Sequence, residues 1–106
     1  MSLRIGNGER VMVETGLTIM EDMNCGTVSA TAWKDLKNHV DVSLTVSDKD
    51  CNEAVEYLRA AGYKTGPCGA AGVAAVRALR HADLLMEDAS IVLINAEGNR
   101  PYTYEV

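Results

Sequence analysis

The stretch Ile91-Val92-Leu93-Ile94 is a continuous run of β-branched residues and leucine. It lacks the alternation of apolar and polar residues that marks a half-exposed strand. Such runs are typical of strands that are covered on both faces in a parallel sheet. The turn-forming stretch Glu97-Gly98-Asn99-Arg100-Pro101 follows it. We therefore expect a buried strand over residues 91–94 that ends before this turn.

A second strand is predicted over residues 40–46. Apolar and polar residues alternate there, so one face of the strand is apolar and the other is polar. The apolar residues of this segment are Val40, Val42, Leu44 and Val46. The stretch Val11-Met12-Val13, inside the glycine-rich residues 4–26, could form a short third strand.

Two helices are predicted between residue 27 and residue 61, because apolar residues recur there at helical spacing. The first covers about residues 27–38, with Thr27 or Ser29 as its N-cap. The second begins at Ser47, which has the spacing of a capping box with Asp50. Gly62 suits the position just past its end, because glycine adopts a left-handed conformation without strain.

A third helix is predicted over residues 66–79. Pro67 suits the first helical position, where its missing N–H is not needed. The segment from Ala70 to Val76 is apolar on every side. We therefore expect this helix to be buried.

The order strand, helix, helix, strand predicts an α/β fold, with a partial parallel sheet, covering helices and a right-handed crossover. Residues 1–106 are expected to form a single piece, with a start at residues 1–3 that is typical of a vector. Such a small sheet leaves its edges and an apolar helix uncovered. We expect either the rest of a longer polypeptide or a second copy of the chain, in a homo-oligomer, to cover them.

Composition excludes several classes of partner. The 106 residues include 10 Lys and Arg against 15 Asp and Glu, which gives a net charge of −5. Because the basic residues do not cluster, nucleic acid and anionic membranes are not expected as partners. The chain has no apolar run long enough to span a membrane and no signal-peptide pattern at its start, so we expect a cytoplasmic protein.

The three cysteines, Cys25, Cys51 and Cys68, are odd in number and widely spaced. This pattern favours reduced thiols over a disulfide framework or a zinc site. No metal site is therefore expected.

Four stretches of the chain resemble, in order, the C-terminal portion of the diaminopropionate ammonia-lyases, which are pyridoxal-phosphate enzymes of fold type II, the group similar to the β subunit of tryptophan synthase. They are Thr18-Ile19-Met20 with Asn24-Cys25-Gly26-Thr27; Ala32-Trp33 with Val40-Asp41 and Val46-Ser47-Asp48; Gly66-Pro67-Cys68-Gly69-Ala70-Ala71; and Glu97-Gly98-Asn99-Arg100-Pro101-Tyr102. The resemblance covers residues 18–102.

The resemblance implies that 2,3-diaminopropionate is converted to pyruvate and ammonia with pyridoxal phosphate as cofactor and electron sink. In such enzymes the lysine that holds the cofactor as a Schiff base and the glycine-rich phosphate loop lie earlier in the chain. No lysine here has the expected flanking residues, and Gly6-Asn7-Gly8 is only a weak imitation of the loop. We therefore expect part of such an enzyme that is inactive alone, and no catalytic residue is assigned.

Two other functions remain open at this point. One is a threonine or serine dehydratase, which would share the fold and the cofactor. The other is a free-standing, non-catalytic module that binds a small ligand or a partner chain and self-associates.

The resemblance implies cofactor contacts at two places. At the end of the strand over residues 91–94 the group usually has a hydroxyl that bonds the pyridine nitrogen, and this chain has an amide, which can donate or accept. The alternative is an asparagine that stabilises a turn. At the start of the third helix, free amides could approach a substrate carboxylate or line the cofactor pocket. The candidate cofactor-binding residues are Asn95, Glu97, Gly98, Pro67, Cys68 and Gly69.

Overall fold

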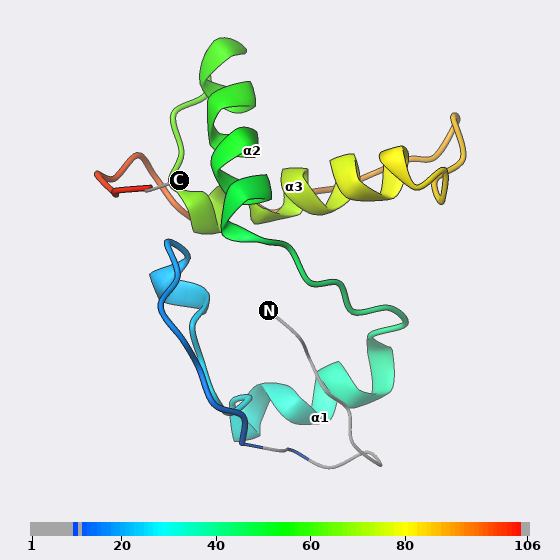
Figure 1. The fold of residues 1–106 in the computed structure, drawn as a ribbon. Helices are drawn as coiled ribbons and strands as arrows, with labels where there is room; N and C mark the ends of the chain where they lie inside the picture. The colour runs from blue at the N-terminus through cyan, green and yellow to red at the C-terminus, as the bar shows by residue number, and fades with distance from the viewer. Residues whose placement is uncertain (1–9, 11, 105–106) are drawn as a thin grey trace.

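The computed structural model describes residue 10 and residues 12–104, and these residues form helices joined by irregular segments (Figure 1). In chain order the elements are the 3-10 helix η1 (Glu21–Met23) and the α-helices α1 (Ala30–His39), α2 (Asp48–Ala60) and α3 (Pro67–His81). None of these helices is long and apolar enough to cross a lipid bilayer.

The predicted α/β fold is wrong for the described chain, which contains no strand and no sheet. Residues 41–46 and 90–95 make no backbone hydrogen bond to another described residue. A strand exists only where a neighbouring strand pairs with its N–H and C=O groups, and neither segment finds that neighbour. The predicted crossover between two parallel strands is therefore also wrong. Of the third predicted strand, Val11 lies outside the described residues and Val13 belongs to no strand.

Residues 91–94 are exposed instead of buried. Val92 and Ile94 expose 91% and 86% of their surface. The segment runs back along α3, where a Cβ atom on Gly72 would lie 3.3 Å from the Leu93 side chain (Figure 1). The burial predicted from this apolar run is therefore wrong for the described chain, in which no other segment covers residues 91–94.

All three predicted helices form, because the signals that start and stop them are local. The Ser29 hydroxyl caps α1 by accepting a hydrogen bond from Ala32 N, and the Ser47 hydroxyl caps α2 in the same way with Asp50 N, at 3.0 Å. Gly62 has a φ of 93° just past the end of α2, as expected for a left-handed C-terminal residue. The boundaries agree with the sequence pattern to within about one turn.

The core lies where α2 crosses α3. Its buried apolar residues are Cys51, Ala54 and Val55 of α2, Ala70, Ala71 and Ala74 of α3, and Met20 from the segment before η1. Small side chains on both helices allow the two backbones to approach closely. The prediction that α3 is buried holds for this face only, since Ala78 and Arg80 are exposed.

Helix α1 lies apart from this core (Figure 1). It has no buried residue, and it packs against no other described element, whereas α3 packs against both α2 and η1. The extended segment over residues 40–46 joins α1 to α2. The described chain therefore has one packed unit, which contains both predicted contact regions.

Candidate functional site

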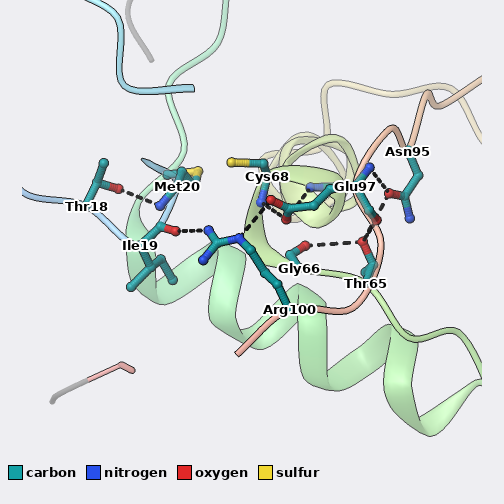
Figure 2. Close-up of polar contacts among 10 residues, drawn as sticks. Thr18, Ile19, Met20, Thr65, Gly66, Cys68, Asn95, Glu97 and Arg100 are labelled. Atoms are coloured by element: carbon teal, nitrogen blue, oxygen red, sulfur yellow. Dashed lines mark hydrogen bonds and ion pairs between the residues drawn. The ribbon is translucent and has the colours of Figure 1, made fainter. Parts of the chain in front are cut away.

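The residues proposed from the sequence meet at the N-terminal end of α3. Gly66 precedes the helix, and Pro67, Cys68 and Gly69 form its first turn. The segment 95–100 returns to this end of the helix and is tied to it by a hydrogen bond from Gly66 N to Gly98 O, at 3.0 Å. Figure 2 shows the polar groups of the two segments facing each other.

Three glycines allow this close approach. A Cβ atom on Gly66 would lie 2.0 Å from Oε1 of Glu97, and one on Gly69 would lie 2.1 Å from Oδ1 of Asn95. Gly72, one turn further on, faces Leu93, with 3.3 Å between its Cβ position and the leucine side chain. The glycines recur every three residues on one helix face, so the segment can lie directly against the backbone of α3.

Glu97 places its carboxylate on the free amides of α3. Its Oε1 accepts hydrogen bonds from Cys68 N at 3.0 Å and from Gly69 N at 3.4 Å. Its Oε2 accepts from Nε of Arg100 at 2.9 Å. The side chain is only 13% exposed, so the Glu97 carboxylate is mostly withdrawn from solvent.

The charge of Glu97 is stabilised in place. Burial by itself would raise the pKa of this carboxyl group. The hydrogen bond and charge of Arg100, with the amides of Gly69 and Cys68, outweigh burial and hold the pKa below its ordinary value. Glu97 is therefore an anion bound internally at the helix N-terminus, where the helix dipole favours negative charge.

Asn95 is oriented by the backbone N–H of Glu97 and lies beside the Thr65 hydroxyl, whose single proton can serve only one of its neighbouring oxygens at a time. Its Oδ1 accepts a hydrogen bond from Glu97 N at 3.2 Å, which closes a turn of the Asx type. The hydroxyl of Thr65, which is 3% exposed, lies 3.0 Å from the same oxygen and 2.8 Å from Glu97 O. No described residue pairs with Nδ2 of Asn95, and the residue is exposed. Asn95 therefore stabilises a turn and also presents a free N–H donor.

A group of possible metal ligands lies beside this network. The Cys68 sulfur and one carboxylate oxygen each of Asp22 and Glu97 all lie within 4.8 Å of one another. Both oxygens of Glu97 already accept hydrogen bonds, and the positive guanidinium of Arg100 stands next to them. Because that charge opposes a cation, we assign no metal here.

The sequence did not single out Thr65 or Arg100. Thr65 is a polar residue and Arg100 a charged residue of kinds that are common in loops. Thr65 binds a partner 30 residues away, and Arg100 joins Glu97 to Ile19, which is 81 residues away. A signal for Arg100 existed in the stretch that resembles the ammonia-lyases, which includes it. Thr65 gave no signal beyond its place before the glycine that starts α3.

All four lysines of the chain, Lys34, Lys37, Lys49 and Lys64, are exposed. Lys49 pairs with Glu53 on the surface of α2, at 3.8 Å. None of the four takes part in the hydrogen-bond network at the start of α3.

A model of one protein family, described as pyridoxal-phosphate dependent enzymes, matches residues 2–97, which is most of the chain. The match includes the start of α3 and the segment after it as far as Glu97. The chain belongs to the pyridoxal-phosphate dependent enzymes. No curated protein and no solved structure matches it significantly. The family expected from the sequence is thus confirmed at this level, and pyridoxal phosphate is the cofactor of the family.

The residues of this pyridoxal-phosphate family member fit one side of the cofactor. The ring nitrogen of pyridoxal phosphate is a hydrogen-bond acceptor, and the exposed Nδ2 of Asn95 is a free donor. The phosphate needs unoccupied donors, but the Cys68 and Gly69 amides already hold Glu97. The space that a Cβ of Gly66 or Gly69 would take is filled by Glu97 and Asn95. The network therefore suits the ring and not the phosphate.

Proposed function

We propose that this chain supplies the ring-facing side of the cofactor site in a pyridoxal-phosphate dependent ammonia-lyase that converts 2,3-diaminopropionate to pyruvate and ammonia. The family match supports the cofactor, and the four collinear stretches described above support the substrate class. The observation that carries the proposal is the free donor of Asn95 beside the α3 N-terminus, in a chain of this family.

When bound, pyridoxal phosphate draws electrons from the α-carbon of the amino acid and so eases loss of its proton and of the β-amino group. Nδ2 of Asn95 would donate a hydrogen bond to the ring nitrogen, and a donor at this place would favour a ring nitrogen that carries no proton. Cys68 and Gly98 line the same end of α3. Glu97 stays bound to the α3 amides and to Arg100, which compensate its charge.

The chain's own lysines have no assigned part in this reaction, since all four are exposed and outside the network. We therefore expect no turnover by the chain alone. The proposal concerns binding and orientation of the ring, and its test is a binding experiment.

The test is a titration of the isotope-labelled chain with pyridoxal phosphate, followed by NMR. We expect the Asn95 side-chain amide and the backbone amides of Cys68 and Gly69 to shift. Asn95→Asp replaces the donor with a negative charge, and loss of one hydrogen bond of about 1 kcal/mol weakens binding about fivefold. Asn99→Asp is the matched control, because Asn99 is exposed in the same segment and lies outside the network. Equal effects of the two substitutions would contradict the proposal.

The substrate class is tested on the protein as its source organism makes it. Loaded with pyridoxal phosphate, it should release pyruvate from 2,3-diaminopropionate faster than keto acid from threonine or serine. Faster release from threonine or serine would instead identify the dehydratase alternative. The Asn95 titration tests the contact with the ring, which the lyase and the dehydratase would share. The assay tests only which substrate is preferred, so either experiment can fail without the other.

A self-associating, non-catalytic module is the second candidate, and the exposed apolar side chains of residues 91–94 favour it. A second copy of the chain would cover Val92 and Ile94, which monomeric proteins seldom expose side by side. Under this candidate, sedimentation at micromolar concentration gives a dimer and pyridoxal phosphate leaves the Asn95 signal unchanged. A stable monomer would exclude it.

A further inference from the structure

We propose that Arg100 is a positioning residue for this site. Arg100 holds the Glu97 carboxylate on the α3 amides, and Glu97 in turn fixes the Asn95 carboxamide with its nitrogen directed outward. The inference rests on the proposed function for what Asn95 contacts. The arrangement of Arg100, Glu97 and Asn95 itself is described by the structure.

Arg100 joins two segments that are far apart in the sequence. Its Nε donates to Oε2 of Glu97 at 2.9 Å, and its Nη2 donates to the backbone oxygen of Ile19 at 2.6 Å. The side chain is 24% exposed. Figure 2 shows the guanidinium lying between Ile19 and Glu97. A planar guanidinium presents several donors at fixed angles, so it can hold both partners at once.

The anchor of Arg100 at Ile19 is itself fixed. Ile19 N donates to Oδ2 of Asp48 at 3.1 Å, and the Thr18 hydroxyl donates to the other oxygen of the same carboxylate. Asp48 is the first residue of α2. Met20, the residue after Ile19, is buried in the core between α2 and α3. Arg100 therefore links Glu97 to a backbone group that is held in place by α2 and by the core.

Glu97 connects Arg100 to Asn95, because its side chain binds Arg100 and its backbone N–H binds Asn95. With the carboxylate bound at both oxygens, the N–H of Glu97 points to Oδ1 of Asn95 and its C=O accepts from Thr65. Since Oδ1 is the acceptor, Nδ2 is the atom left for a ligand. Without Arg100, Glu97 keeps only the amide contacts at 3.0 and 3.4 Å, and the turn that orients Asn95 loosens.

The experiment compares Arg100→Ala, Arg100→Lys and the control Arg59→Ala by amide hydrogen exchange, without cofactor. Arg59 also pairs with a glutamate three residues away, Glu56, but on the exposed surface of α2. We expect Arg100→Ala to speed exchange at Cys68, Gly69 and Glu97 about tenfold, in line with loss of one charge-assisted hydrogen bond. Arg59→Ala should leave these amides unchanged.

Two further readouts separate positioning from general stability. Exchange at the core amides of Val55 and Ala74 should stay as in the wild type. Arg100→Lys should be intermediate, because an ammonium keeps the charge but lacks the fixed, separated donors with which the guanidinium reaches Glu97 and Ile19. If core and site amides of Arg100→Ala speed up by the same factor, Arg100 is only structural and the inference is wrong. Should Arg100→Ala unfold, the same comparison on Arg100→Lys decides.

Pyridoxal phosphate titrations of the same variants distinguish the two proposals. If the wild type shows no shift at Asn95, the proposed function fails, while the exchange data still judge the role of Arg100. If the wild type binds pyridoxal phosphate and exchange at Cys68, Gly69 and Glu97 is unaffected by Arg100→Ala, the inference about Arg100 fails and the proposed function stands.

Discussion

Glu97 is a charged residue held in a mostly buried position by fixed donors. Its oxygens accept bonds from two backbone amides and from Arg100. Such a group adds stability only while it is ionised. The described site is therefore sensitive to acid through this residue.

The first prediction concerns the stability of the chain in acid. Because the pKa of Glu97 is lower in the folded chain than the ordinary value of about 4.3, its contribution is complete above that value. The contribution is lost as the pH falls through the lower, folded-state pKa. Urea unfolding at pH 7 and pH 3 should show a smaller loss of stability in Glu97→Gln than in the wild type.

The control for this measurement is Glu56→Gln, an exposed glutamate that also pairs with an arginine three residues away. Its pH dependence should match that of the wild type. Identical acid sensitivity of the wild type and Glu97→Gln would mean that the Glu97 carboxylate is not bound as described.

The second prediction tests the close approach at Gly69. An alanine Cβ there would lie 2.1 Å from Asn95 Oδ1 and 2.3 Å from Thr65 Oγ1, so the segment must move. Gly69→Ala should destabilise the chain by about 1–3 kcal/mol, measured by urea unfolding. Gly98→Ala is the control in the same site, because nothing lies within 4 Å of its Cβ position. Equal stability of both variants would contradict the packing of this segment on α3.

The sequence identified which segments meet at the site but not how they meet. Asn95 and Glu97 were proposed as ligand contacts, and the structure shows that Glu97 instead binds the helix amides proposed for the ligand. Thr65 and Arg100 orient both residues, yet a hydroxyl and a guanidinium in loops carry no local mark of such a role. Long-range hydrogen bonds depend on the fold, so residue patterns alone could not reveal them.

At the scale of elements, the helices were predictable and the strands were not. The Ser47 cap and the Gly62 stop act within a few residues, so the sequence around α2 determines its limits. The apolar run at residues 91–94 is equally clear in the sequence, but a strand needs the backbone of a distant partner. That partner is missing from the described residues, and the segment stays irregular.

The third prediction concerns the contact between α2 and α3. Ala74 is 2% exposed and faces α2, and Ala74→Asp would bury an unpaired carboxylate there. The loss should be about 3 kcal/mol or more, enough to unfold a small domain. Ala78→Asp lies one turn further along α3 at an exposed position and should cost far less. Circular dichroism during thermal unfolding measures both, and equal melting temperatures would show that the Ala74 face of α3 is open.

At the scale of the whole molecule, the packed unit consists of α2, α3, η1 and the segments that pack on them, among them residues 95–102. Large apolar side chains outside it are exposed, among them Val42, Leu44, Val92 and Ile94. A chain of this size buries a limited fraction of its surface, so uncovered apolar segments leave little stability in reserve. Any cover for these segments would add to the stability of the unit that carries the site.

The fourth prediction concerns covalent attachment of the cofactor. All four lysines are exposed and outside the network, so none has a neighbourhood that would favour it over the others. After treatment with pyridoxal phosphate and borohydride, mass spectrometry should find low labelling spread over several lysines. Stoichiometric labelling of one lysine would contradict this and would place a reactive lysine near the site.

The hydrogen bond from Arg100 to Ile19 spans 81 residues of the chain. Closing so long a loop costs more entropy than forming α2 and α3, whose contacts are nearer in sequence. The bond should therefore form late in folding, after the helix pair has docked. During synthesis Arg100 must leave the ribosome before Ile19 finds its partner, so the site takes shape only after α2 and α3 have both been made.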